Sequence, residues 1–149
     1  MTKVTTIKEY SFTLWSKPLS INNAKFRNGR FKPSSKLWLD NIHNELSPHS
    51  NALTLLGQDF DPSCQSLMFY LTFYLPKLYT KSGTISKISN DLSNIEKILI
   101  DCICSDKVNE HTPNLNLNDA FICDLISKKR STDDDAHVVV KIAIRDGLL

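Results

Sequence analysis

The stretch that most constrains the fold lies at residues 66–75, with the sequence SLMFYLTFYL. It contains two Phe-Tyr pairs, each followed by a leucine, and aromatic residues of this kind favour strands. Apolar side chains occupy both sets of alternating positions, so neither face of this strand is suited to water. A strand with two apolar faces is covered on both sides. We therefore predict that residues 66–75 form a central strand of a sheet.

Weaker patterns before and after this strand predict five more elements. Tyr10, Phe12 and Leu14 alternate with polar residues, which predicts a strand at 9–15. A first helix is predicted to follow Pro33 and to end near Ser47 and Pro48, and a second to begin at Asp91. Two further strands are predicted at 119–126 and 136–144. Polar connections are predicted at 16–33, 49–63, 76–88, 105–118 and 127–135.

The resulting order is β-α-β-α-β-β, which we assign to the α+β class. Its 149 residues fit one domain, spanning 1–149, that is long enough to bury a substantial core. We expect one mixed sheet with the helices packed on one face, and a hairpin formed by the last two strands.

The composition, 41% hydrophobic and 23% charged, is typical of a globular protein. No run of about 18 apolar residues is present, so we expect no membrane span. The first residues, MTKVTT, lack the apolar stretch of a signal peptide. We therefore expect a cytoplasmic protein.

Four cysteines, Cys64, Cys102, Cys104 and Cys123, allow two interpretations. The spacing Cys102-x-Cys104 differs from the usual zinc pattern, and Cys102 falls within an apolar helical pattern. Buried thiols are the simpler interpretation. A zinc site that includes His111 stays open.

Basic residues are concentrated at the start of the chain. The whole sequence has a net charge of only +2, but residues 1–40 contain eight basic residues and two acidic ones. This distribution suits a protein that contacts a polyanion such as DNA, through phosphates rather than base edges. The candidate DNA-binding residues lie in the loops: Lys17, Lys25, Arg27, Arg30, Lys32, Lys77, Lys81 and Lys87.

Two carboxylates lie at the ends of predicted elements, Asp91 at a helix start and Asp119 where a polar segment enters a strand. One or two carboxylates, completed by waters and substrate phosphates, are a common way to hold Mg2+. Lys97, two turns after Asp91, is placed to stabilise negative charge on a reacting phosphate. Taken alone, Asp91 has a simpler role as a helix N-cap.

The string DLSNIEK at 91–97, followed by Asp101 and by LNDAFI at 117–122, resembles the signature of the RusA-type Holliday-junction resolvases. The family pattern is D-x-D-N-apolar-x-K, a later acidic residue, and then an apolar-D-D element. An early P-x-S-x-N is matched by Pro18, Ser20 and Asn22. The resemblance covers most of the chain in the same element order.

This resemblance implies a crossover junction endodeoxyribonuclease, active as a homodimer on four-way DNA junctions. It implies phosphodiester hydrolysis that depends on Mg2+, with Mn2+ as a substitute. Asp91 and Asp119 match metal-binding acids, and Lys97 matches the catalytic lysine of the motif. Asn94 and Asp101 match the accompanying polar positions.

The sequence departs from the family pattern at two acids: Ser93 replaces the second carboxylate of D-x-D-N, and Asn118 replaces the first of D-D. A serine offers a cation only a neutral oxygen or a bridging water. Either another acid compensates, or the protein binds branched DNA with little cleavage. A third interpretation is an α+β protein that binds other proteins. The candidate compensating acids are Asp101, Asp124 and the run at 133–135.

Overall fold

The computed structural model describes residues 5–19, 28, 30, 32–86, 91–104 and 117–146. These residues form a four-stranded sheet from β1 (Thr5–Leu14), β2 (Gln65–Leu75), β3 (Ile122–Ser131) and β4 (His137–Asp146). The strand order is β1-β4-β2-β3. β4 pairs antiparallel with both β1 and β2, and β3 pairs parallel with β2. The sheet is therefore mixed, and β2 has the interior position that its apolar residues predict.

The two faces of the sheet differ in what covers them. On β2, Phe69 and Phe73 point to one face and are almost completely buried, while Tyr70 and Tyr74 point to the other and are half-buried. On β4, Val140 and Ile142 are likewise buried, whereas Val139 and Lys141, which point to the other face, are half-buried. This alternation is the normal result of the two-residue period of a strand.

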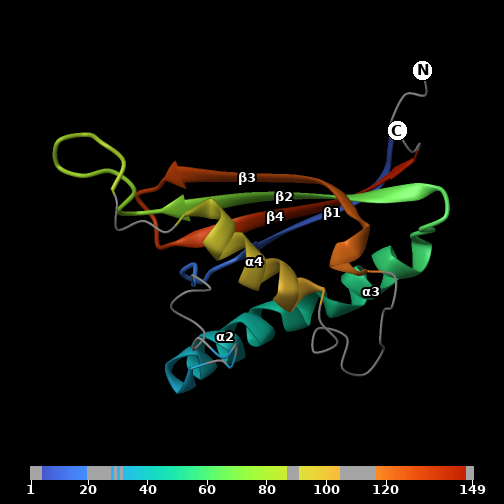
Figure 1. Ribbon diagram of the computed structural model, residues 1–149, viewed down its shortest axis with the longest axis horizontal. Coiled ribbons are helices and arrows are strands. Elements are labelled where there is room, and N and C mark those ends of the chain that lie inside the picture. Colours follow the sequence, from blue (N-terminus) through green and yellow to red (C-terminus); the bar gives the residue numbers. More distant parts are fainter. Residues whose placement is uncertain are drawn as a thin grey trace.

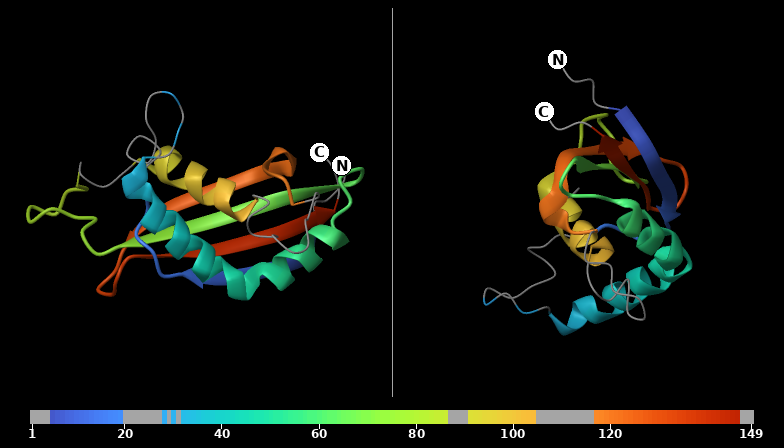
Figure 2. Two further views of the ribbon diagram at one scale, coloured as in Figure 1. Left: turned by 90° about the horizontal axis from the view of Figure 1, so that it is seen from below. Right: turned by 90° about the vertical axis from the view of Figure 1, so that its right-hand side faces the viewer.

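Three α-helices in the described part of the chain cover the buried face. They are α2 (Lys36–Leu46), α3 (Ser50–Asp59) and α4 (Leu92–Ile103). Figures 1 and 2 show all three on the same side of the sheet, which is the arrangement predicted for the two helices expected from the sequence. None of the described helices is long and apolar enough to cross a membrane. Short 3-10 turns lie at Pro33–Ser35 (η1), Ser47–His49 (η2) and Asp119–Phe121 (η3).

The predicted face of α4 is the one that packs on the sheet. Ile95, Leu99 and Ile103 are buried, whereas Ser93 and Lys97 are exposed. Full burial of an isoleucine or leucine contributes about 1.5–3 kcal/mol each. This packing fixes which side chains of α4 face outward along β3, where the candidate site lies.

The predicted polar connection at 49–63 was wrong, because most of it forms α3. Leu53 and Leu56 recur at helical spacing and are buried, and Phe60 closes the segment against the core. The first helix ends near Ser47 and Pro48 as predicted, since α2 stops at Leu46 with Ser47 as its C-cap. Pro48 lies in the first turn of η2, where the missing N–H of a proline costs no hydrogen bond.

The boundaries of the third strand also differ from prediction. Asp119–Phe121 is a 3-10 turn rather than strand, and β3 runs on through Lys128, Lys129 and Arg130, which were predicted to lie in a turn. β3 is an edge strand, and charged residues are common on such strands because one edge faces water.

The predicted closing hairpin was wrong as well. β2 lies between β3 and β4, so the last two strands do not pair with each other. α4 instead forms the crossover that makes β3 parallel to β2, a connection that parallel strands require. As a result, α4 lies directly over β3.

Candidate metal and nucleic-acid sites

Asp91 occupies the N-cap position of α4 with an extended backbone, as predicted. Its backbone oxygen accepts from the N–H groups of Asn94 (3.0 Å) and Ile95 (3.2 Å). Its carboxylate makes no capping hydrogen bond to the helix and is exposed. The carboxylate therefore remains available to another partner at the positive end of the helix dipole.

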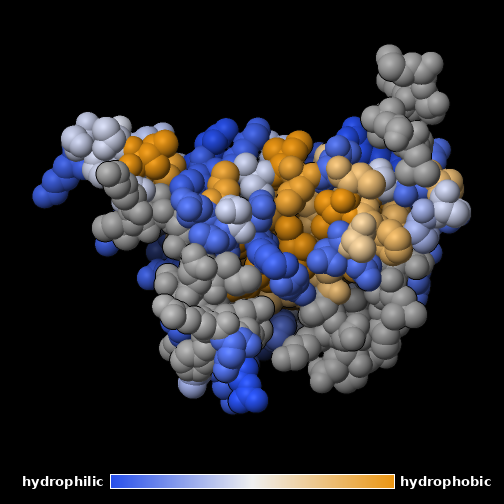
Figure 3. Space-filling view, in the orientation of Figure 1, coloured by the Kyte–Doolittle hydropathy of each residue, from blue (hydrophilic) through white to orange (hydrophobic). Residues whose placement is uncertain are grey.

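A cavity of about 310 Å3 runs along the outward side of α4, between this helix, the start of β3 and η3. Ser93, Lys97 and Asp101 reach it from α4 because residues four apart share one helix face. Figure 3 shows an exposed apolar band in this region with hydrophilic side chains beside it. The lining residues are Ser93, Glu96, Lys97, Ile100, Asp101, Asp119, Ile122 and Leu125.

Asp119 enters this cavity from η3. Asn118 caps that turn: its side-chain oxygen accepts from the N–H of Ala120 at 2.9 Å. The residue that replaces an acid of the family pattern thus shapes the turn that carries Asp119. The side chain of Asp119 is exposed.

Asp119 lies toward the C-terminal end of α4. The pKa of the Cys104 thiol, just past that end, is raised to about 12 by burial and then by the nearby carboxylates of Asp119 and Asp101. A helix rises about 1.5 Å per residue, so Asp91 and Asp101 are separated by about 15 Å. Asp91 is not among the residues that line the cavity. The structure thus brings Asp119 together with Asp101, Lys97 and Ser93 rather than with Asp91.

Two polar contacts organise the cavity. The ammonium of Lys97 and the carboxylate of Asp101 form an ion pair at 3.7 Å, with both side chains partly exposed. Glu96 accepts a hydrogen bond from the hydroxyl of Ser127 on β3. Sequence reasoning missed Glu96, although its position three residues after Ser93 places it on the same helix face.

The donor set of this cavity suits a hard cation. The carboxylates of Glu96, Asp101 and Asp119 and the hydroxyl of Ser93 are the oxygen ligands that Mg2+ prefers. Among the described residues, no three His, Cys, Asp or Glu side chains converge closely enough to form a preformed metal cluster. The fit is therefore to an ion held by one or two carboxylates, with waters and substrate phosphates completing its coordination.

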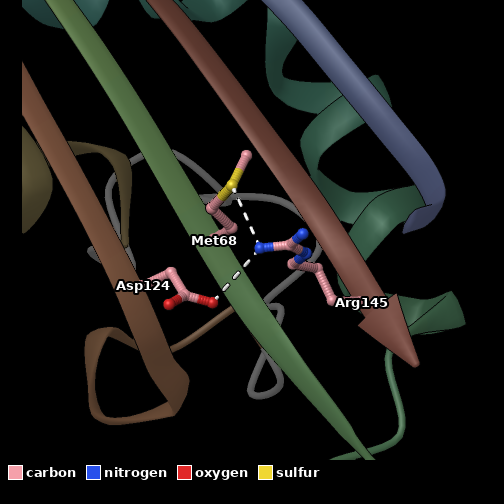
Figure 4. A network of polar contacts seen from close by, with 3 residues as sticks. All are labelled: Met68, Asp124 and Arg145. Atoms are coloured by element: carbon pink, nitrogen blue, oxygen red, sulfur yellow. Dashed lines mark hydrogen bonds and ion pairs between the residues drawn. The ribbon is translucent and has the colours of Figure 1, made fainter. Parts of the chain in front are cut away.

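The other acids that could compensate for Ser93 lie elsewhere. Asp124 points to the open face of the sheet, where its carboxylate pairs with Arg145 at 3.4 Å beside Met68 (Figure 4). The acidic run at 133–135 is exposed in the connection between β3 and β4. Of the candidates, only Asp101 lines the cavity.

Three of the predicted DNA-binding lysines line one groove. Lys17 follows β1, and Lys77 and Lys81 follow β2, yet all three border a groove of about 650 Å3. Tyr79, which is 55% exposed, lies among them, and no acidic residue is part of the described lining. A groove that combines cations with an aromatic ring suits a nucleic-acid strand.

The other predicted basic residues either do not line this groove or lie outside the described part of the chain. Arg30 is exposed and Lys32 is half-buried. Lys25, Arg27 and Lys87 lie outside the described residues.

The cysteines form no disulfide with one another. Cys102 is buried and Cys104 is half-buried, whereas Cys64 and Cys123 are exposed. Burial as small hydrophobic side chains, the simpler prediction, thus holds for Cys102 and fails for Cys64 and Cys123. His111, the remaining residue of the zinc alternative, lies outside the described residues.

Comparison of the sequence with protein-family models and with curated proteins finds no match. The chemistry of the cavity and the groove therefore carries the functional assignment.

Proposed function

We propose that the protein is a structure-selective DNA endonuclease that resolves four-way junctions by Mg2+-dependent phosphodiester hydrolysis. The observation that carries this proposal is the cavity in which Asp101, Asp119 and Lys97 meet. The lysine groove supports it, because the loop with Lys77 and Lys81 directly precedes α4 in the chain. The lysines of this loop thus lie shortly before α4 in the chain, and the carboxylates of the cavity lie on α4 and η3.

In the proposed reaction, water adds to phosphorus and one P–O ester bond breaks, which leaves a hydroxyl on one fragment and a phosphate monoester on the other. Mg2+, when bound, polarises the phosphate and lowers the pKa of water. Asp119 and Asp101 would hold the cation, and Ser93, about 12 Å before Asp101 along α4, would offer a neutral oxygen to a bound water or to the substrate. Lys97 exchanges its ion pair with Asp101 for the negative charge that develops on the phosphate.

The second candidate is a protein that binds branched DNA without efficient cleavage. The cavity favours this alternative in one respect, since the position of the second family acid is occupied by the hydroxyl of Ser93. A missing negative charge weakens the attraction for a divalent cation. For both candidates we propose a homodimer, because a symmetric four-way junction presents two equivalent strands to two subunits. We also propose that the protein acts in the cytoplasm.

A nicking assay on a synthetic four-way junction, with linear duplex as the competing substrate, tests the proposal. We expect nicking of the junction in Mg2+ or Mn2+, and loss of nicking in Asp119→Asn. The matched control is Asp124→Asn, which makes the same chemical change on the opposite face of the sheet. The control should nick as the unmodified protein does.

Two results would change the assignment. Nicking that persists in both Asp91→Asn and Asp119→Asn would place the reaction elsewhere. Junction binding without nicking, unchanged in Ser93→Asp, would favour the binding protein.

A further inference from the structure

A hairpin at residues 77–86, between β2 and α4, projects beyond the end of the sheet as the yellow-green loop of Figures 1 and 2. Tyr79 and Ile85 form the antiparallel bridge of this hairpin. All residues from 79 to 85 are exposed. A side chain added at Gly83, near the tip, would meet no atom within 4 Å. The tip of the hairpin is therefore open to a partner.

Internal hydrogen bonds stabilise the hairpin. The backbone N–H of Thr80 donates to the carbonyl of Thr84 at 2.8 Å, and the N–H of Ser86 donates to that of Leu78 at 2.7 Å. The hydroxyl of Thr80 lies 2.9 Å from the hydroxyl of Thr84 and 2.9 Å from that of Ser82. Leu78 is buried at the base of the hairpin. A hairpin that is ordered before binding loses less entropy when it contacts a partner.

The hairpin holds an apolar pair in contact with water. Tyr79 is 55% exposed and Ile85 is 59% exposed. Directly opposite residues of an antiparallel pair point to the same face, so these two side chains form one surface. Exposed apolar surface that is rimmed by polar side chains is typical of an interaction site.

The charge of the hairpin indicates which partner this surface fits. Lys77 and Lys81 are exposed on it, and the sequence has no acidic residue between Asp61 and Asp91. Apolar side chains between cations suit a partner in which phosphates surround flat apolar rings, which is the chemistry of nucleic acid. In a continuous duplex, stacking covers the faces of the bases. At the branch point of a four-way junction, the flanking base pairs can unstack and offer these faces.

The hairpin lies shortly before the helix that lines the carboxylate cavity. Asp91 follows Ser86 by five residues, so their Cα atoms are at most about 18 Å apart. Asp91 caps α4, and Ser93 and Lys97 of this helix line the cavity. A hairpin bound at a branch point would therefore bring the DNA strands that leave this point to the start of α4.

We propose that the 77–86 hairpin is a wedge for the branch point of DNA, with Tyr79 and Ile85 packed on an unstacked base pair and Lys77 and Lys81 on the flanking phosphates. The inference rests on the proposed function and extends it, since it names the element that distinguishes branched from linear DNA. Proteins that insert apolar side chains between base steps recover the cost of unstacking through added contacts. A branch point unstacks at a lower cost than a continuous duplex, so the wedge favours the junction.

The relative affinity for junction and duplex tests the wedge. The anisotropy of labelled four-way junction and of labelled linear duplex is measured in EDTA, so that no cleavage is required. We expect the ratio of junction affinity to duplex affinity to fall roughly 5- to 150-fold in Tyr79→Ala/Ile85→Ala, the range for loss of one stacked base. The fluorescence of 2-aminopurine beside the branch point responds to stacking. It should change when the unmodified protein binds, and should not change when the double variant is bound at saturation.

Single variants separate the wedge from the lysine groove. Tyr79 lines that groove, whereas Ile85 is not part of its described lining. Ile85→Ala should therefore weaken junction binding and leave duplex binding unchanged. Tyr79→Phe keeps the ring and should retain most of the preference for the junction. Leu55→Ala is the matched control, because Leu55 is 57% exposed on α3, outside the hairpin, and it should bind both DNAs as the unmodified protein does.

Three results would overturn the wedge. One is an equal loss of junction and duplex affinity in the double variant, which would indicate a general phosphate-binding surface. Another is unchanged fluorescence of 2-aminopurine when the unmodified protein binds the junction. The third is binding to anionic lipid vesicles that is lost in the double variant while both DNA affinities are unchanged, which would indicate a membrane surface as the partner.

The nicking assay separates this inference from the proposed function. Preference for the junction in EDTA that depends on Tyr79 and Ile85, without nicking in Mg2+, would support the wedge and refute the nuclease. Nicking that depends on Asp119, with the same junction preference in the double variant and the unmodified protein, would refute the wedge and keep the nuclease.

Discussion

Ser93→Asp restores a carboxylate to the cavity on α4, and its effects can be worked out from the structure. Ser93 is the second residue of the helix, no acidic residue lies in its first turn, and Lys97 follows four residues later. A carboxylate in the first turn stabilises a helix by about 0.3–1 kcal/mol through the dipole. A pair with Lys97 adds about 0.2–0.5 kcal/mol. Without divalent cations, we expect the free energy of unfolding to rise by roughly 0.5–1.5 kcal/mol.

The second effect concerns Mg2+. Ser93 lies eight residues before Asp101, about 12 Å along the helix, and at that separation the doubly charged Mg2+ attracts a carboxylate by about 0.7 kcal/mol in water of low ionic strength. The value for water applies because Ser93, Asp119 and the Lys97 side chain are exposed. An attraction of this size corresponds to Mg2+ binding about 3-fold tighter.

Thermal or urea unfolding at increasing Mg2+ concentrations measures both effects. A ligand that binds only the folded state stabilises it in proportion to the logarithm of its concentration over Kd. The Mg2+ concentration at which stabilisation begins should therefore fall about 3-fold in Ser93→Asp. Ionic strength is kept constant with a monovalent salt, since exposed charges are screened.

Asn94→Asp is the matched control. It adds the same charge to the same helical turn, but Asn94 does not line the cavity. It should gain the dipole stabilisation without binding Mg2+ more tightly. If Ser93→Asp leaves the Mg2+ dependence unchanged, or if Asn94→Asp shifts it equally, the assignment of the cation to this cavity is refuted.

Two other predictions concern the lysine groove and Cys104. Replacing Lys77 and Lys81 by alanine should reduce the slope of log affinity against log salt by about 0.9 for each phosphate that is no longer neutralised, measured on junction DNA. Lys8→Ala, whose ammonium pairs with a carboxylate on α3, should leave that slope unchanged. The pKa of Cys104 is raised to about 12, so the folded state retains a proton that the unfolded state loses above about pH 9. Unfolding free energy should thus be unaffected by this group below pH 9 and should fall between about pH 9 and 12, by at most about 1.4 kcal/mol per pH unit. Cys104→Ala should remove that part of the pH dependence, and an unchanged profile would contradict the assignment.

The sequence alone determined the elements whose patterns are strong and local. Residues 66–75 are apolar at most positions and form an interior strand between β4 and β3, as predicted, although helices cover only one of its two faces and Tyr70 and Tyr74 on the other face are half-buried. The start of α4 at Asp91 followed from its position before a run of residues at helical spacing. Local patterns were misleading where charge or proline suggested a loop, as in α3 and in the second half of β3. In both, tertiary packing overrode the local signal.

Only the tertiary structure decided which distant residues meet. Asp91 and Asp119 both lie at ends of elements, but α4 points its outward face at η3, so that Asp119 faces Asp101 and Lys97 instead. The groove that joins Lys17 to Lys77 and Lys81 exists because the ends of β1 and β2 lie at the same end of the sheet. Side-chain periodicity is a property of neighbouring residues and is written in the sequence. Proximity between segments depends on strand order and helix packing, which the whole core sets together.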